Sequence, residues 1–227
     1  MGKPVVQLPV REGYRLWAPT YDSAPNPLLA LEERIAAPML GPLAGSRVVD
    51  LCAGTGRWMA IARRGAANVA GIDLSPEMLS CAAQKPGCAG RVALADLTSL
   101  PLHSGAADLA ICSFGISYVA SLAAAFREMA RVARRILISD LHPAAAQAGW
   151  RRSFENGSQT CCVAYYARSL DELDEAARAA GFSPQQTVEA RFGEPERCIF
   201  ASAGKEHLFE EVSRIRAVFA KTWTLGC

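Results

Sequence analysis

The sequence predicts an α/β protein built on a doubly wound, mostly parallel sheet that ends in an antiparallel C-terminal hairpin. From Arg47 onward, short apolar runs alternate with longer segments of helical spacing, which is the pattern of βα units on a parallel sheet. The runs are apolar throughout, as is typical of strands covered by helices on both faces. After Pro143 the pattern changes to a helix followed by two strands, which predicts the hairpin.

Five apolar runs are the predicted parallel strands, and three segments between them have helical spacing. The strands are RVVDL (47–51), NVAGID (68–73), RVALAD (91–96), ADLAICSF (107–114) and RILISDL (135–141). The helices are expected at 57–64, 76–84 and 121–133. Ser75 before Pro76 offers a helix cap followed by proline at the first helical position. We expect the crossovers between these strands to be right-handed.

The segments on either side of this core differ from it. Before it, an aromatic stretch (14–21) and a helical stretch (28–40) lie outside the predicted sheet. After it we expect a loop rich in Gly, Ser and Asn (149–160), a helix (170–180) ended by Gly181, and strands near 186–192 and 196–202. Residues 206–221 have the spacing of an amphipathic helix that packs on the domain or on a partner subunit, with Leu208, Val212, Ile215 and Phe219 on one stripe.

The length of 227 residues fits a single domain. We expect an N-terminal lid with helices (1–45), a cofactor-binding core (46–142), and a C-terminal part that contains the substrate-side loop, the hairpin and a helix (143–227). The expected assembly is a monomer or a homodimer.

Composition and charge argue against several classes of partner. Lys and Arg number 24 against 22 Asp and Glu, with no basic block, so nucleic acid is not an expected partner. No apolar run approaches the length of about 20 residues that crosses a bilayer. The first residues do not resemble a signal peptide, so we expect a cytoplasmic protein without membrane contact. The eight cysteines are scattered and form no CxxC pair, which predicts reduced thiols, most of them packed in the core, and no metal site.

The most informative segment runs from Val48 to Gly56, where a strand ends on an acid and turns through glycines into a helix. A carboxylate at the end of this strand, Asp50, would repel a pyrophosphate bound on the turn. NAD sites instead carry their acid on the second strand, so an NAD-linked oxidoreductase is the disfavoured alternative. Asp50 favours a cofactor that carries an amine at this point, and S-adenosylmethionine (SAM) has one on its methionine end.

Two more acids end the next two predicted strands. Asp73 closes the second strand beside the turn and can accept both ribose hydroxyls of a nucleoside. Asp96 follows the third strand and can accept from an adenine amino group, and Leu74, Met78 and Leu97 could hold the ring. Each acid alone could equally be a turn or helix-capping residue. Together, three acids that end three successive strands predict one ligand pocket.

These segments resemble the class I SAM-dependent methyltransferases, and in particular the small-molecule (type 11) branch that includes ubiquinone-biosynthesis and biotin-pathway enzymes. The resemblance runs from about Tyr14 to His142. It rests on DLCAGTG (50–56), GIDLSPEML (71–79), ALADLTSLP (93–101), ADLAICSFGISYV (107–119), FREMARV (126–132) and ISDLHP (138–143). It implies a seven-stranded Rossmann-like methyltransferase fold, SAM as cofactor and S-adenosylhomocysteine as its product.

The resemblance also implies roles for individual positions. The methionine part of SAM would be held by Asp50, Cys52, Ala53, Gly54, Thr55 and Gly56, the ribose by Asp73, and the adenine by Asp96 with Leu74, Met78 and Leu97. Ser113 and Phe114 would line the methyl-donor side. Tyr14, Trp17 and Tyr21 match an N-terminal YxxWAxxYD element that, in such enzymes, folds over the cofactor as a lid.

The sequence departs from this family at two places. Cys52 stands where the family usually has the first glycine of the turn, and we expect the turn to tolerate its small side chain. The run 132–136 lacks the Pro-Gly-Gly turn usually found between the fourth helix and the fifth strand. Either the helix stops early, or a flexible turn is missing from the chain.

A sulfonium methyl group is already activated, so the expected mechanism is in-line displacement by an O, N or C nucleophile of a small molecule. The protein must align the nucleophile, exclude water and accept any proton released, without a nucleophile of its own. The candidates for acceptor contact are Tyr118, His142, Trp150, Arg151 and Arg152.

Among these candidates, His142 is the candidate general base and Tyr118 the second candidate catalytic residue. His142 could instead hydrogen-bond the loop backbone, Trp150 could be packing, and the arginines could be solvated. A SAM-binding protein without catalytic activity is the other alternative.

Overall fold

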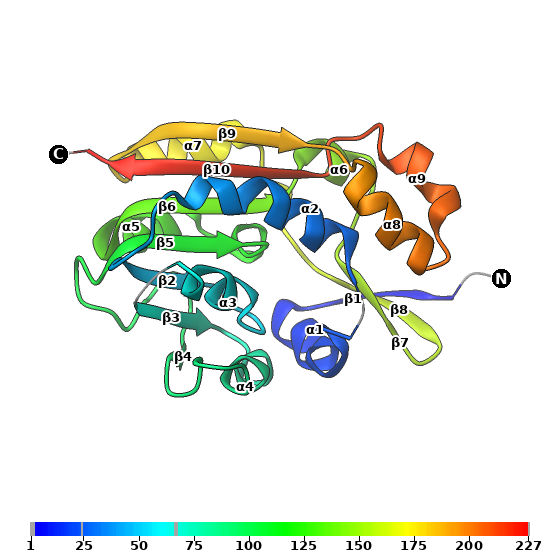
Figure 1. The fold of residues 1–227 in the computed structure, drawn as a ribbon, viewed down its shortest axis with the longest axis horizontal. Coiled ribbons are helices and arrows are strands. Elements are labelled where there is room, and N and C mark those ends of the chain that lie inside the picture. The colour runs from blue at the N-terminus through cyan, green and yellow to red at the C-terminus, as the bar shows by residue number, and fades with distance from the viewer. Residues whose placement is uncertain (1–2, 24, 66–67, 227) are drawn as a thin grey trace.

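The computed structural model describes residues 3–23, 25–65 and 68–226. Within these residues the main sheet has seven strands in the order β4-β3-β2-β5-β6-β10-β9 (Figure 1). They are β2 (Arg47–Leu51), β3 (Asn68–Asp73), β4 (Val92–Leu94), β5 (Ala107–Ser113), β6 (Ala133–Leu141), β9 (Phe182–Ala190) and β10 (Val218–Leu225). β10 is antiparallel to both β6 and β9, whereas the other paired strands are parallel. The predicted fold class is therefore confirmed.

The strand order reverses beside β2. The chain runs outward from β2 through β3 to β4 and then returns to the other side of β2 as β5. A reversal of this kind leaves a crevice at the carboxyl ends of the strands, where α/β proteins bind ligands.

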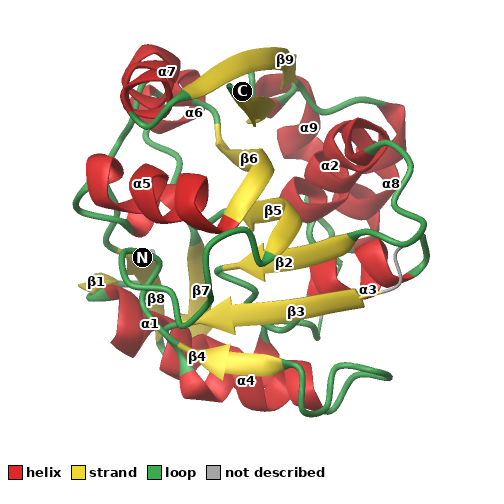
Figure 2. Ribbon diagram, turned by 90° about the vertical axis from the view of Figure 1, so that its left-hand side faces the viewer, coloured by secondary structure: helices red, strands yellow, loops and turns green. Residues whose placement is uncertain are grey.

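Helices cover both faces of the sheet (Figure 2). On one face lie α2 (Pro27–Ala36), its 3-10 extension (Ala37–Leu40) and α3 (Arg57–Arg63), and on the other lie α5 (Leu122–Val132) and α7 (Leu170–Ala179). Successive residues of β2 serve the two layers, because Val48 packs in the first core and Val49 in the second. Helix α4 (Pro76–Ala83) packs beside β3 and β4, and Ser75 caps it by accepting from the amide of Met78, as predicted.

A second sheet is formed by segments far apart in the sequence. Strands β1 (Val5–Leu8), β8 (Gln159–Val163) and β7 (Ser153–Asn156) pair in the order β1-β8-β7. With α1 (Val10–Trp17), this sheet lies beyond the carboxyl ends of the parallel strands (Figure 1). Together they form a small third core, whose buried members are Trp17, Phe154, Cys161 and Val163.

The expectation of a loop at 149–160 was wrong. Most of this stretch is a hairpin that turns at Gly157, and helix α6 (Pro143–Gln147) precedes it. In β7 Phe154 is buried while its neighbours are exposed, so the polar residues reflect a solvent-facing sheet surface and not an irregular segment.

The C-terminal end also differs from expectation. Residues expected as a strand at 196–202 belong to helix α8 (Glu194–Ser202), where Pro195 stands in the first turn and the Glu196 carboxylate accepts from the amide of Gly193 at 2.8 Å. The helix expected over 206–221 ends at Val212 as α9 (Glu206–Val212), and the hairpin partner of β9 is β10. Segment 218–225 is buried between two strands, so sheet pairing overrides its helical spacing.

Helix α5 passes directly into β6. Val132 is the last helical residue, and Ala133 already has extended dihedrals of −137° and 145°. The missing Pro-Gly-Gly turn is therefore replaced by a change of backbone conformation at one residue, and the strand begins two residues earlier than predicted.

Two smaller expectations concern cysteines and membrane contact. Cys88, Cys112, Cys161 and Cys162 are buried, as expected of core residues, but Cys52 and Cys81 are only half-buried and Cys198 is exposed. Cys227 lies outside the described residues. None of the described helices is both long and apolar enough to span a bilayer.

Candidate active site

A cavity of about 420 Å³ opens at the carboxyl ends of β2, β3 and β5, beside the point where the strand order reverses. This volume is within the range of about 300 to 1,000 Å³ that is typical of small-molecule sites. The predicted site residues that line it are Tyr14, Tyr21, Asp50, Cys52, Ala53, Gly54, Thr55, Asp73, Leu74, Met78, Asp96, Leu97, Ser113, Phe114 and Tyr118. Six predicted residues are not part of the lining: Trp17, Gly56, His142, Trp150, Arg151 and Arg152.

The turn after β2 contains a non-glycine residue in the left-handed region. Cys52 has a φ of 61°, the conformation that a glycine adopts without steric cost. Its side chain fits because position 115 is glycine, where a Cβ would lie 2.5 Å from the Cβ of Cys52. The turn thus tolerates the side chain, as expected, and depends on Gly115 to do so.

Asp50 is a buried carboxyl group with one unused oxygen. It is 1 % exposed, its Oδ2 accepts from the amide of Met59 at 3.1 Å, and its Oδ1 has no partner among the described residues. Burial raises the pKa of Asp50 to about 8, against the opposing effect of Arg57. A buried acceptor without a partner is costly, and a cation bound in the cavity would satisfy it.

Asp73 and Asp96 are held in place by backbone amides. Asp73 accepts from the amides of Gly54 and Ser75, both at 2.8 Å, which ties the turn to the end of β3. Burial raises the pKa of Asp73 as well. In Asp96 the two hydrogen bonds, from the amide and hydroxyl of Thr98, both reach Oδ1. Each acid keeps acceptor capacity for a ligand, since a carboxylate has about four lone-pair sites.

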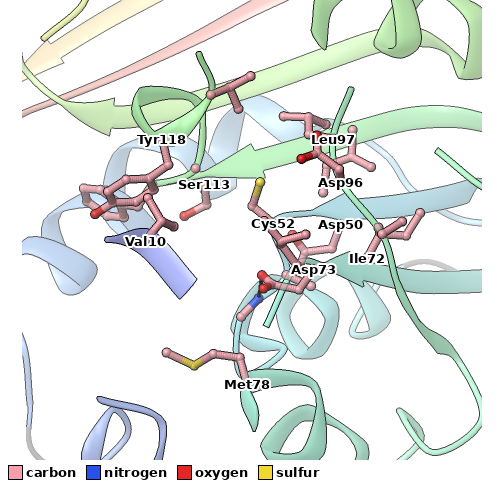
Figure 3. Close-up of a pocket in the computed structure, with 18 of the residues that line it drawn as sticks. Val10, Asp50, Cys52, Ile72, Asp73, Met78, Asp96, Leu97, Ser113 and Tyr118 are labelled. Atoms are coloured by element: carbon pink, nitrogen blue, oxygen red, sulfur yellow. Dashed lines mark hydrogen bonds between the residues drawn. The ribbon is translucent and has the colours of Figure 1, made fainter. Parts of the chain in front are cut away.

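The lining residues divide the cavity into two ends (Figure 3). Asp96 and Leu97 lie on one side of the view, Tyr118 and Val10 on the other, and Ser113 and Cys52 lie between them. Leu74, next to Asp73, is 37 % exposed although it is apolar, so it offers a hydrophobic surface for a planar ring at the first end.

The N-terminal aromatic segment closes over the turn. Asp22 accepts from the hydroxyl of Thr55 at 2.9 Å and forms an ion pair of 2.8 Å with Lys85. Tyr14 and Tyr21 reach the cavity, whereas Trp17 packs behind them with its ring stacked on Phe154 at 4.8 Å. Trp17 therefore supports the lid and does not line the cavity.

Sequence reasoning missed Arg57, which also lines the cavity. Its guanidinium forms an ion pair with the fully buried Glu32 and donates to the hydroxyl of Ser113 at 3.1 Å. Glu32 also accepts from the indole of Trp58 at 2.9 Å and from the hydroxyl of Ser139. The sequence contained one signal for this network. Glu32 is an acidic residue among the apolar positions of the predicted helical stretch 28–40, and such a residue is rarely buried unless it is paired.

Comparison of the sequence with known protein families gives a match that covers the central part of the chain. Residues 48–136 match the sequence profile of the methyltransferase domain, and this segment contains β2 to the start of β6 with all three acids. This part of the chain, residues 48–136, therefore resembles a methyltransferase domain.

The matching relatives and structures agree with this assignment. The chain is 41 % identical over 96 residues to the demethylmenaquinone methyltransferase of Mycobacterium marinum, and this match covers 42 % of this chain and 39 % of that protein. It is 31 % identical over 102 residues to the malonyl-[acyl-carrier protein] O-methyltransferase of Pectobacterium atrosepticum, covering 45 % and 40 %. The chain thus matches about two fifths of the length of these curated relatives.

A SAM-dependent methyltransferase from Mesorhizobium loti has the same fold. Its crystal structure superposes with a TM-score of 0.66 at 22 % identity, over 87 % of this chain and 99 % of that one. This likeness concerns the fold.

SAM is the cofactor of this class, and the donor set of this methyltransferase fits it. The unpartnered Oδ1 of Asp50 suits the ammonium group, Asp73 suits the two ribose hydroxyls, and Asp96 suits the adenine amino group.

The remaining candidates lie outside the cavity. His142 caps α6, where its Nδ1 accepts from the amide of Ala144 at 2.9 Å and its Nε2 lies 2.6 Å from Glu189. Trp150 stacks on Phe192 in the core, and the exposed Arg151 donates to the hydroxyl of Tyr165. The structure therefore does not bring these three residues to the site, because the 143–168 segment folds as a helix and a hairpin instead of a loop over the cavity.

Proposed function

We propose that this methyltransferase transfers the methyl group of SAM to a nucleophilic O, N or C atom of a small molecule by in-line displacement. The observation that carries the proposal is Asp50, a buried carboxyl group in the cavity wall whose Oδ1 accepts no hydrogen bond from the part of the chain that the structure describes. SAM supplies a sulfonium methyl group that needs no further activation when it is bound.

The protein residues bind and orient the two reactants. Asp50 holds the ammonium group, while Asp73 and Asp96 hold the two polar edges of the adenosine. Because the backbone amides of Gly54, Ser75 and Thr98 fix the last two carboxylates, these acids are in position before the ligand arrives. Positioning of this kind can supply up to about 7 to 11 kcal/mol of barrier reduction.

The tyrosines of the lid, together with Tyr118, exclude water and present hydroxyl groups to the acceptor. Tyr118 lines the end of the cavity that lies away from Asp96 (Figure 3). Burial raises the pKa of Tyr118 to about 12, so at neutral pH its hydroxyl is protonated and donates a hydrogen bond. Tyr118 thus orients the acceptor and does not act as its base.

The experiment that tests the proposal is calorimetric titration of the purified protein with S-adenosylhomocysteine and, separately, with NAD. Micromolar binding of S-adenosylhomocysteine alone is the expected result, and binding of NAD alone would overturn the proposal. Asp50→Asn should weaken binding of S-adenosylhomocysteine roughly 10-fold or more, since a hydrogen bond to a charged group is lost. Asp108→Asn is the matched control, because Asp108 pairs with Arg47 on an exposed surface and does not line the cavity.

Turnover separates the enzyme from a SAM-binding protein without activity. Incubation with methyl-labelled SAM and pools of small phenols, carboxylic acids and amines should label one pool, and labelling should require Asp50. Tight binding without transfer to any pool would instead favour the non-catalytic alternative.

A further inference from the structure

Arg152, the residue immediately before β7, is a buried cation that forms no ion pair with any other described residue. Only 6 % of the surface of Arg152 is exposed to solvent. The guanidinium lies 4.4 Å from the ring centroid of Phe114, and its Nη2 donates to the hydroxyl of Tyr21 at 2.7 Å. Its Nη1 is buried without a hydrogen-bond partner among the described residues, and none of the ion pairs that those residues form includes Arg152.

Three tyrosine side chains line the cavity near this charge, and Tyr21 contacts Arg152 directly. Tyr14, Tyr21 and Tyr118 all line the cavity, with ring centroids 5.5 Å apart for Tyr14 and Tyr118 and 6.3 Å apart for Tyr14 and Tyr21. Burial raises the pKa values of Tyr14 and Tyr118 well above the neutral range. These two phenols therefore remain hydrogen-bond donors at neutral pH, in a site that already holds a buried positive charge.

The carboxyl group of Asp140 interacts with Arg152 electrostatically, but the two form no ion pair among the described residues. Asp140 is 3 % exposed and its two oxygens accept from the backbone amides of Ser117 and Leu141, at 3.1 and 2.7 Å. A buried charge that lacks a paired counter-ion is expensive, and an anion bound beside the tyrosines would offset much of that cost.

The position of Phe114 brings the charge close to the cavity. Phe114 follows β5 directly and has a φ of 47°, a sparsely populated conformation for a residue with a side chain. Its amide donates to the carbonyl of Ser139 at 2.8 Å, which holds this conformation. Phe114 lines the cavity while its ring lies against the guanidinium of Arg152, so the charge lies directly behind one residue of the cavity wall.

We propose that Tyr14, Tyr21, Tyr118 and Arg152 form the acceptor subsite, and that it selects a small organic acid whose carboxylate accepts from the tyrosine hydroxyls. Arg152 is a positioning residue in this arrangement: it orients Tyr21 and supplies the balancing charge without lining the cavity itself. The inference rests on the proposed function, because an acceptor subsite requires that SAM occupy the other end of the cavity.

The test compares carboxylic acids with their neutral amides on protein saturated with S-adenosylhomocysteine. Three matched pairs serve as probes in calorimetric titration at pH 7.5: benzoate and benzamide, phenylacetate and phenylacetamide, and hexanoate and hexanamide. In at least one pair the acid should bind roughly 10- to 100-fold more tightly than its amide, as expected for charge-assisted hydrogen bonds. This preference should be lost in Arg152→Gln and largely kept in Arg152→Lys, and Arg151→Gln on the exposed neighbour should leave it unchanged.

Each other outcome counts against the subsite. Equal affinity for acid and amide in every pair overturns the proposal, as does the absence of millimolar binding by any of the acids. Retention of the full preference in a folded Arg152→Gln protein also overturns it. If Arg152→Gln does not fold, Tyr118→Phe replaces it, with an expected loss of preference of several-fold from one missing hydroxyl. Failure of the wild type to bind S-adenosylhomocysteine would defeat the proposed function, whereas normal binding of it without acid preference defeats the subsite alone.

Discussion

The hydroxyl of Thr55, in the glycine-rich turn, donates a 2.9 Å hydrogen bond to the carboxylate of Asp22, at the end of the aromatic lid. The other oxygen of Asp22 forms an ion pair of 2.8 Å with Lys85, which follows α4. One carboxylate thus connects the lid, the turn and the helix after β3. Lid position and turn geometry should therefore respond together to cofactor binding.

Asp22→Ala should weaken the binding of S-adenosylhomocysteine without unfolding the protein. Asp22 is about half exposed, so its contacts are worth roughly 0.5 to 1.5 kcal/mol, or about 2- to 10-fold in affinity. Calorimetric titration measures the affinity, and urea denaturation should show little change in the free energy of unfolding. Glu155→Ala is the control, since Glu155 forms its exposed ion pair with Lys3 away from the cavity. Equal affinities for the two variants would show that Asp22 does not hold the lid on the turn.

The buried Asp50 predicts a pH dependence of cofactor binding. With a folded pKa of about 8 and an ordinary pKa of about 3.9, Asp50 is mostly protonated at neutral pH and ionises as the pH rises through 8. The ammonium group of the ligand binds the ionised form, so the affinity for S-adenosylhomocysteine should increase between pH 6 and 8. Asp50→Asn should remove this increase, and Asp108→Asn should retain it. A flat profile in the wild type would contradict the assignment of Asp50 to the ammonium group.

The same pKa has the opposite consequence for stability. Because the folded protein binds the proton of Asp50 more tightly than the unfolded chain does, this group stabilises the fold fully below pH of about 4, and the contribution disappears as the pH rises toward 8. Urea denaturation of the unliganded protein should show a smaller decline in the free energy of unfolding over this window for Asp50→Asn than for the wild type. If the free energy of unfolding declined equally in the wild type and in Asp50→Asn, a group other than Asp50 would be responsible for the pH dependence.

The sequence was sufficient to predict the parallel core because each strand there carries its own signal. β2 and β3 coincide with predicted segments, since an apolar run that ends on Asp50 or Asp73 needs no partner to be recognised. The acids converge for a general reason: parallel strands bring their carboxyl ends to the same edge of the sheet.

The C-terminal strand and the position of Arg152 depend on contacts between distant segments, which local sequence patterns do not reveal. Segment 218–225 became a strand because β6 and β9 pair with it on both sides, and its buried Lys221 is compensated by Asp174 at 2.7 Å. Arg152 reached the cavity region because β8 pairs with β1, more than 150 residues earlier, as in the register of Val5 with Thr160. No periodicity within either segment indicates such a pairing, so the acceptor end was less predictable than the cofactor end.

The close contact between Cys52 and position 115 predicts a reciprocal pair of substitutions. Gly115→Ala should destabilise the protein by about 1 to 3 kcal/mol, because its Cβ would overlap the side chain of Cys52 in a packed wall of the cavity. Cys52→Gly removes that side chain and also suits the left-handed φ of 61°. The double variant should therefore be more stable than Gly115→Ala alone, as a double-mutant cycle in urea measures. Strict additivity of the two changes would contradict the overlap, although Cys112 also lies 3.1 Å from the added Cβ and should keep the recovery incomplete.

Removal of the buried Glu32 carboxylate should be the most destabilising single change near the cavity. Glu32 is fully buried and serves Arg57, Trp58 and Ser139 at once, so Glu32→Ala leaves a charge and two donors without their partner. Loss of one member of a buried ion pair costs about 3 to 5 kcal/mol. Glu33→Ala is the matched control on the same helix, because Glu33 is 40 % exposed and lies 3.8 to 3.9 Å from its arginine partners, and it should change stability by less than about 1 kcal/mol. Urea denaturation distinguishes the two. A similar, small effect of both substitutions would mean that water or a rearranged Arg57 satisfies the buried groups, and the network would then not position Arg57 in the cavity wall.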